Sequence, residues 1–120
     1  MSSGERVLVC GGRDYDDVEC VFATLDDLDR RVGVQEVITG GASGADSYGH
    51  HWAQDRGKPS VIFTADWAKW GRGAGPLRNQ RMLDEGKPTL VVAFPGGKGT
   101  ADMCRRAREF GVPLLKVAPR

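Results

Sequence analysis

The chain contains 120 residues, of which 17 are glycine and 40% are hydrophobic, and its formal net charge is +1. The glycines follow no three-residue period, which excludes collagen, and the hydrophobic residues form compact blocks, which excludes a disordered chain. The balanced charge gives no general case for binding to nucleic acid or membranes. We expect one domain over residues 1–120, with a flexible start at residues 1–5.

Five apolar runs of strand length recur along the chain. They are rich in Val, Ile and Leu and do not alternate with polar residues, which is typical of strands buried on both faces of a parallel sheet. The predicted strands are Arg6–Cys10, Glu36–Thr39, Ser60–Thr64, Thr89–Phe94 and Pro113–Val117.

Segments with helical periodicity lie between these runs. The first carries an apolar stripe at Val18, Val21, Phe22, Leu25 and Leu28, and the last at Met103, Cys104, Ala107 and Phe110, with Arg105, Arg106 and Arg108 toward solvent. Glycine adopts the left-handed turn that ends many helices, so four helices are expected to end at Gly33, Gly57, Gly86 and Gly111.

Strands that alternate with helices predict an α/β fold. We expect a single Rossmann-like domain with about five parallel strands, right-handed crossovers and helices on both faces of the sheet. Ligands of such sheets bind beyond the carboxyl ends of the strands.

Eleven of the 17 glycines gather in four clusters, each of which follows or adjoins the carboxyl end of a predicted strand. The clusters are Gly11-Gly12, Gly40-Gly41 with Gly44, Gly71 with Gly73 and Gly75, and Gly96-Gly97 with Gly99. Glycines allow backbone N–H groups to approach a phosphate, and a helix N-terminus adds unpaired donors. The gathering of these glycine clusters at one edge of the predicted sheet predicts that this edge binds an anion.

The stretch Phe94–Asp102 fits that interpretation best, because a buried strand there leads through Pro95-Gly96-Gly97 into a helix. Thr100 would cap the helix or donate to a phosphate oxygen. The alternative is a tight strand-to-helix turn with a threonine cap and no ligand.

Two other loops allow both a binding and a structural interpretation. Ser43 and Asp46 have the spacing of a helix-capping pair, which explains them about as well as binding does. Arg13 is suited to a phosphate and Asp14 to a ribose hydroxyl, although acidic residues also favour the first turn of a helix.

The segment from Ala65 to Arg81 combines two tryptophans, four cations and three glycines. We expect a long mobile segment that folds over a ligand, with Trp stacking on a base and Arg gripping phosphate. The alternative is that Trp67 or Trp70 packs on the core. Trp52 is expected in the core.

Several site classes are absent from the sequence. No G-x-x-x-x-G-K-[ST] motif occurs, and no G-x-G-x-x-G follows the first strand. The three cysteines and two histidines have no zinc-ligand spacing. We expect no metal, no cofactor and no membrane segment, and a reduced cytoplasmic setting.

The set of motifs resembles the YspA-related branch of the SLOG superfamily, which includes the LOG phosphoribohydrolases and DprA. The resemblance rests, in chain order, on Gly11–Tyr15, Thr39–Asp46, Ala65–Trp67, Gly75–Asn79 and Phe94–Thr100. It implies a Rossmann-like sheet, a nucleotide-derived ligand near the ends of the first and fourth strands, and homo-oligomers.

The sequence departs from the LOG enzymes at one position. Their P-G-G-x-G-T stretch leads to a catalytic glutamate, and Met103 stands in that place, whereas Arg78 matches their upstream arginine. Methionine cannot stabilise an oxocarbenium ion or activate water. The catalytic residues are therefore unknown, with Arg78 and Asp102 as candidates and Asp14 as another carboxylate.

These observations favour binding of a nucleotide or a nucleotide-derived phosphate compound. The alternative is LOG-like cleavage of the N-glycosidic bond of a nucleoside monophosphate, and DprA-like nucleic-acid binding ranks third. A homo-oligomer (dimer or tetramer) is expected. The candidate ligand-binding residues are Gly11, Gly12, Arg13, Asp14, Gly40, Gly41, Ser43, Trp67, Arg72, Arg78, Asn79, Pro95, Gly96, Gly97, Gly99 and Thr100.

Overall fold

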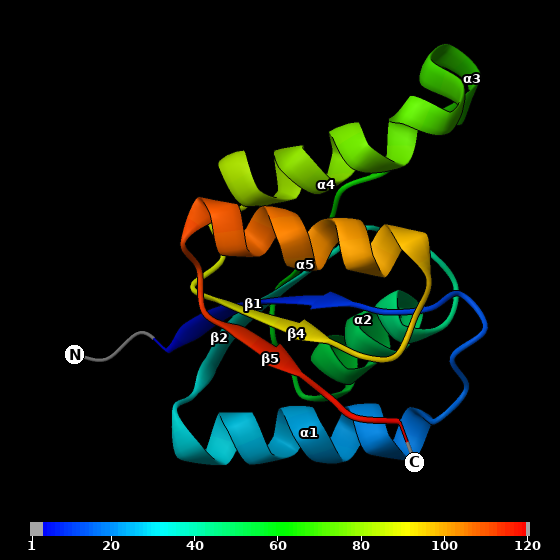
Figure 1. The fold of residues 1–120 in the computed structure, drawn as a ribbon. Coiled ribbons are helices and arrows are strands. Elements are labelled where there is room, and N and C mark those ends of the chain that lie inside the picture. Colours follow the sequence, from blue (N-terminus) through cyan, green and yellow to red (C-terminus); the bar gives the residue numbers. More distant parts are fainter. Residues whose placement is uncertain (1–3, 120) are drawn as a thin grey trace.

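A five-stranded parallel sheet forms the centre of the computed structural model, which describes residues 4–119. The strand order is β3-β2-β1-β4-β5, and every neighbouring pair is parallel (Figure 1). The strands are β1 (Glu5–Cys10), β2 (Val34–Thr39), β3 (Ser60–Ile62), β4 (Leu90–Ala93) and β5 (Leu114–Lys116). The predicted α/β class and parallel sheet are confirmed.

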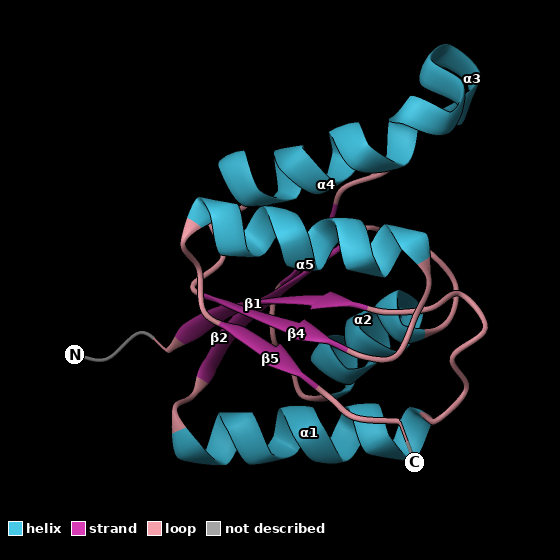
Figure 2. Ribbon diagram, in the orientation of Figure 1, coloured by secondary structure: helices cyan, strands magenta, loops and turns pink. Residues whose placement is uncertain are grey.

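Helices cover both faces of this sheet (Figure 2). Helices α1 (Val18–Arg31) and α2 (Ala45–Asp55) lie on one face, and α4 (Ala74–Asp84) and α5 (Lys98–Phe110) lie on the other. A short helix α3 (Trp67–Trp70) and a 3-10 turn (Gly71–Gly73) precede α4. The segment that we expected to be long and mobile is therefore mostly helical.

The central strands bury both of their faces. In β1, Val7 and Val9 belong to the core beneath α1 and α2, whereas Leu8 and Cys10 belong to the core beneath α4 and α5. Trp52 is fully buried in the first of these cores, as predicted. A strand with two buried faces has no polar side to alternate with, which explains its continuous apolar run.

The edge strands depart from the prediction of full burial. Strand β3 ends at Ile62 rather than Thr64, and Val61 and Ile62 are about 40% exposed, at 39% and 43%. An edge strand has a neighbour on one side only and is less completely covered by helices. Sequence hydrophobicity cannot separate a central strand from an edge strand.

Three of the four predicted helix ends carry a glycine in the left-handed conformation, namely Gly33, Gly57 and Gly111. Gly86 does not: the residue with positive φ after α4 is Lys87, at φ 49°. A Cβ at Gly86 would collide with the carbonyl oxygen of Met82. This glycine is needed for close approach, not for a left-handed turn.

Helix α5 follows its predicted stripe only in part. Met103, Cys104 and Ala107 are buried, but Phe110 is 46% exposed. Arg106 does not point into solvent as predicted, because its guanidinium bonds to Asp102 at 2.8 Å and to Gln80 on α4 at 2.9 Å. It joins the two helices of that face.

Candidate functional site

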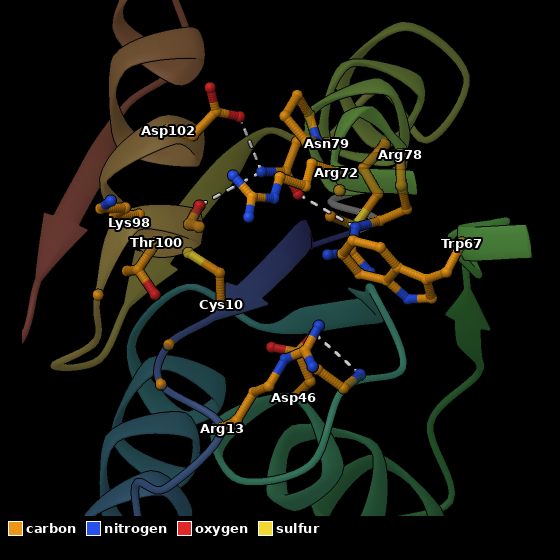
Figure 3. Close-up of a pocket in the computed structure, with 18 residues that line it drawn as sticks. Cys10, Arg13, Asp46, Trp67, Arg72, Arg78, Asn79, Lys98, Thr100 and Asp102 are labelled. Atoms are coloured by element: carbon orange, nitrogen blue, oxygen red, sulfur yellow. Dashed lines mark hydrogen bonds between the residues drawn. The ribbon is translucent and has the colours of Figure 1, made fainter. Parts of the chain in front are cut away.

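A cleft of about 470 Å³ opens at the carboxyl end of the sheet (Figure 3). Its walls come from the loop after β1, from the start of α2, from α3 and α4, and from the N-terminus of α5. Because α2 and α5 cover opposite faces of the sheet, the cleft lies between the two helical layers. This is the position expected for a ligand of a Rossmann-like sheet.

Eleven candidate residues from the sequence line this cleft, and six do not. Those that line it are Gly11, Gly12, Arg13, Trp67, Arg72, Arg78, Asn79, Gly97, Gly99, Thr100 and Asp102. Those outside the lining are Asp14, Gly40, Gly41, Ser43, Pro95 and Gly96.

Close packing between loops explains part of the glycine clustering. A Cβ at Gly11 would come within 2.6 Å of the Ala45 Cβ, and one at Gly96 within 2.6 Å of the Gly12 nitrogen. A Cβ at Gly97 or Gly99 would meet no atom within 4 Å, and neither residue has a positive φ. Packing therefore requires the first two glycines but not the last two, which border open space in the cleft.

The N-terminus of α5 presents unpaired donors to this space. Gly97 is the N-cap residue, and no side chain caps the helix. Within residues 4–119, the N–H groups of Lys98, Gly99 and Thr100 have no hydrogen-bond acceptor. Thr100 lies inside the first turn, so of its two interpretations the helix cap does not form. The first turn of a 13-residue helix thus remains available to an anion.

A hydrogen-bonded network fixes Arg78 beside these donors. Its Nη1 donates to the carbonyl oxygen of Gly40 at 2.7 Å, and its Nε donates to Oδ1 of Asn79 at 3.1 Å. Asn79 in turn donates to Gly99 at 3.3 Å and to Asp102 at 3.0 Å. Burial lowers the pKa of the Arg78 guanidinium from its very high ordinary value, against the pull of Asp46.

Asp102 lines the cleft but is committed to this network. It accepts hydrogen bonds from Asn79, Arg105 and Arg106. These bonds hold the pKa of Asp102 below its usual value although burial acts in the opposite sense. Met103, at the position of the LOG glutamate, is fully buried in the core and does not line the cleft.

Asp46 is a second cleft carboxyl, in the first turn of α2. Its Oδ2 accepts the N–H groups of Gly40 at 3.1 Å and Ala42 at 3.3 Å. Burial raises the pKa of Asp46 to about 6, although those two N–H groups and the nearby Arg78 and Arg13 oppose the rise. The 40–44 loop therefore already directs two N–H groups at a carboxylate of its own chain.

The predicted Ser43–Asp46 capping pair does not form. The N-cap of α2 is Gly44, without a side-chain hydrogen bond, and the Ser43 hydroxyl donates to the Arg13 carbonyl oxygen at 3.3 Å. In the first loop, Asp17 caps α1 by accepting the Cys20 N–H at 3.0 Å, while Asp14 is exposed. The acidic run near Asp14 thus includes one true helix cap.

Trp67 forms an exposed wall of the cleft. Its ring lies against Gly75 of α4, and the Arg13 guanidinium stands 5.3 Å from the ring centroid. Trp67 is 47% exposed and Trp70 is 52% exposed, so neither packs in the core. The stack of Arg13 on Trp67 closes the side of the cleft between the first loop and α3 (Figure 3).

Seven lining residues are absent from the candidate ligand-binding and catalytic residues named from the sequence, namely Cys10, Ala42, Asp46, Gly75, Pro76, Met82 and Lys98. Asp46 is the most informative of them, since it shares one helical face with Gly49 and Ala53, which are both buried. A carboxylate on the core-facing stripe of a helix is the signal that could have identified it. Burial raises the pKa of the Cys10 thiol, which keeps that sulfur protonated.

Among residues 4–119, no group of three or more His, Cys, Asp or Glu side chains is arranged to hold a metal ion. No helix in the same range is long and apolar enough to cross a membrane.

Replacing Asn79 with Ala should lower the free energy of unfolding by about 1–3 kcal/mol, because Asn79 is buried and satisfies three polar partners. Chemical denaturation measures this loss. Gln54, an exposed amide on α2, is the control, and its replacement by Ala should cost less than about 0.5 kcal/mol. Equal losses for the two variants would contradict the role of Asn79 as the connector of α4 and α5.

The fold and the cleft together define a Rossmann-like α/β domain with a candidate ligand site at the ends of β1 and β4. The chain belongs to the YspA, cpYpsA-related SLOG family, whose model matches residues 5–70. It is 36% identical over 123 residues to the Gene 61 protein of Mycobacterium phage D29, an alignment that covers 96% of this chain and 98% of that protein.

Two solved structures share the fold at 18% sequence identity. DNA processing protein A (DprA) from Streptococcus pneumoniae matches with a TM-score of 0.75 over 96% of this chain. Glycinamide ribonucleotide transformylase 1 from Symbiobacterium toebii matches with a TM-score of 0.56 over 99% of this chain. The chain spans about half the length of each, at 50% and 53%.

Proposed function

We propose that the cleft binds a nucleotide or a nucleotide-derived phosphate compound, with a phosphate at the N-terminus of α5. One observation carries this proposal. The N–H groups of Lys98, Gly99 and Thr100 lack acceptors within residues 4–119, and they adjoin Gly97 and Gly99, which packing does not require. Backbone donors at a helix N-terminus bind phosphate through hydrogen bonds and the helix dipole.

The charges around the cleft support an anionic ligand. Arg13, Arg72, Arg78 and Lys98 all line it. Arg78 donates hydrogen bonds through its Nε and Nη1 atoms. The Nη2 atom of Arg78 makes no hydrogen bond to any described residue. A guanidinium that is fixed on one side and free on the other suits a phosphate oxygen without further ordering.

The comparisons support a ligand related to nucleotides. The family belongs to the SLOG group, and the names of the two structural neighbours refer to DNA and to a ribonucleotide. Nucleic-acid binding ranks lower because the net charge of the chain is only +1.

Hydrolysis also ranks lower, since Met103 is buried in the core and Asp102 is held by three hydrogen-bond donors. We extend the proposal to a homo-oligomer, which sedimentation velocity would detect.

Isothermal titration calorimetry against a panel of nucleotides and their parent nucleosides tests the function. The panel includes nucleoside mono- and diphosphates, cyclic nucleotides and ADP-ribose. At least one phosphorylated compound should bind, and its nucleoside should bind at least tenfold more weakly. Binding that is equal with and without the phosphate, or no binding across the panel, would overturn the proposal.

Trp67 is the aromatic group placed to stack on a base. Replacing it with Ala should weaken binding of the tightest nucleotide about tenfold, since stacking of a base on an aromatic ring is worth about 1–3 kcal/mol. Trp70 is the matched control, because it is similarly exposed, at 52% against 47%, but does not line the cleft. Calorimetry measures both variants, and equal effects would exclude a specific role for Trp67.

A further inference from the structure

The two carboxylate oxygens of Asp46 have different environments. Oδ2 accepts the N–H groups of Gly40 and Ala42, which fixes the orientation of the carboxyl group. Within residues 4–119, no group donates a hydrogen bond to Oδ1. Asp46 is only 5% exposed, yet it lines the cleft. It is therefore a nearly buried acceptor whose remaining hydrogen-bonding capacity is available to a molecule in the cleft.

The position of Asp46 limits what it can contact. It comes from α2 on one face of the sheet, whereas the free N–H groups come from α5 on the other face. In Figure 3, Asp46 lies beside Arg13, and Cys10 lies between it and the α5 residues Thr100 and Asp102. If a phosphate binds at the N-terminus of α5, the group of the ligand that is attached to this phosphate would lie nearer to Asp46.

A carboxylate at this place selects for a hydrogen-bond donor. It repels phosphate oxygens and attracts O–H groups, because a carboxylate oxygen accepts hydrogen bonds and donates none. Burial raises the pKa of Asp46, so ionisation of this carboxyl is less favourable than in water. Groups kept at such a cost in a cleft are frequently functional.

We propose that Asp46 recognises a ribose hydroxyl of the bound compound and makes the cleft selective for ribonucleotides over deoxyribonucleotides. This inference rests on the proposed function and adds the sugar to it. It assigns to Asp46 the role that sequence reasoning gave to Asp14, which is exposed and does not line the cleft.

Asp46→Asn is the discriminating variant, because an asparagine can keep the bonds from Gly40 and Ala42 through Oδ1 and then presents an N–H₂ group to the cleft. Asp14→Asn is the matched control. Calorimetry compares the tightest ribonucleotide of the panel, its 2′-deoxy and 3′-deoxy forms, and inorganic pyrophosphate. Thermal unfolding confirms that each variant is folded.

The wild-type chain should bind the ribonucleotide at least tenfold more tightly than one of the deoxy forms. Asp46→Asn should bind all three nucleotides within about twofold of one another and should bind pyrophosphate no more weakly than wild type. Asp14→Asn should behave as wild type. A wild-type chain that does not distinguish the sugars, or an Asp46→Asn variant that keeps the preference, overturns the inference.

The wild-type chain provides a further test that needs no substitution. The ratio of ribonucleotide to deoxyribonucleotide affinity should fall as the pH drops through about 6, where Asp46 takes up a proton. Titration of the phosphate affects both ligands and cancels in the ratio. The charged or titratable groups that act on Asp46 are Arg13, Arg78 and Cys10.

The two proposals fail in different ways. If no phosphate compound binds to the wild-type chain, the proposed function fails and this inference fails with it. If nucleotides and pyrophosphate bind but the sugar preference is absent or independent of Asp46, the proposed function stands and this inference alone is wrong.

Discussion

Gly97→Asp will reduce nucleotide binding at least a hundredfold without destabilising the protein. A Cβ at Gly97 meets no atom within 4 Å, and φ is −101°, so there is room for a side chain at this position. Aspartate is a favourable N-cap, and its carboxylate would accept the N–H groups of Gly99 or Thr100. It would therefore occupy the donors that the phosphate needs and repel the phosphate as well.

Two variants and two measurements check this expectation. Calorimetry gives the affinity and thermal unfolding gives the stability, which should stay equal to wild type or rise. Gly97→Asn caps the helix without a charge, so it should weaken binding less than Asp does. Gly73→Asp places a carboxylate at another open N-cap glycine, outside the lining of the cleft, and should change the affinity less than threefold. Unchanged binding in Gly97→Asp would place the anion elsewhere.

Asp46→Asn will change how stability depends on pH. The pKa of Asp46 is raised from 3.8 to about 6 in the folded protein. Between these values the folded state binds more protons than the unfolded state, so the free energy of unfolding falls as the pH rises. The penalty is absent well below pH 4 and complete above pH 6. A pKa shift of this size lowers the free energy of unfolding by about 3 kcal/mol once Asp46 is ionised. The asparagine variant does not ionise and lacks this penalty.

The difference between variant and wild type isolates this effect. The free energy of unfolding of Asp46→Asn minus that of wild type should increase by about 3 kcal/mol between pH 4 and pH 7.5. Asp26, Asp29 and Asp102 have lowered pKa values and give the opposite slope, but they are present in both proteins and cancel. Urea denaturation at several pH values measures the difference, with Asp14→Asn as the control. If this difference in the free energy of unfolding does not change with pH, burial does not raise the pKa of Asp46.

The fold was largely predictable because its signals are local. The apolar runs at Val7–Cys10 and Val91–Phe94, and the stripe at Val21 and Leu25, depend on neighbours in the sequence and are buried as the pattern requires. The left-handed glycines Gly33 and Gly57 are equally local signals. What failed was the segment around Trp67–Gly73, where glycines and tryptophans masked short helical turns.

The site was predictable only as a region. The glycine clusters mark the edge of the sheet at which the cleft opens, yet Gly11 and Gly96 serve loop packing whereas Gly97 and Gly99 border the cleft. Sequence spacing cannot separate these two uses, because each depends on atoms from a distant loop. Asp46 illustrates the same limit, since its role is set by Gly40, Ala42 and Arg78 together.

The sequence by itself determined the α/β class, the order of the main strands and helices, and the edge of the sheet at which the cleft opens. These follow from hydrophobic periodicity and from glycine's backbone freedom, which are properties of short segments. The tertiary structure alone decided which glycines face open space, which carboxyl is free toward the cleft and which is held by Asn79 and Arg106. Burial, close approach and hydrogen-bond partners arise only when segments far apart in the chain meet.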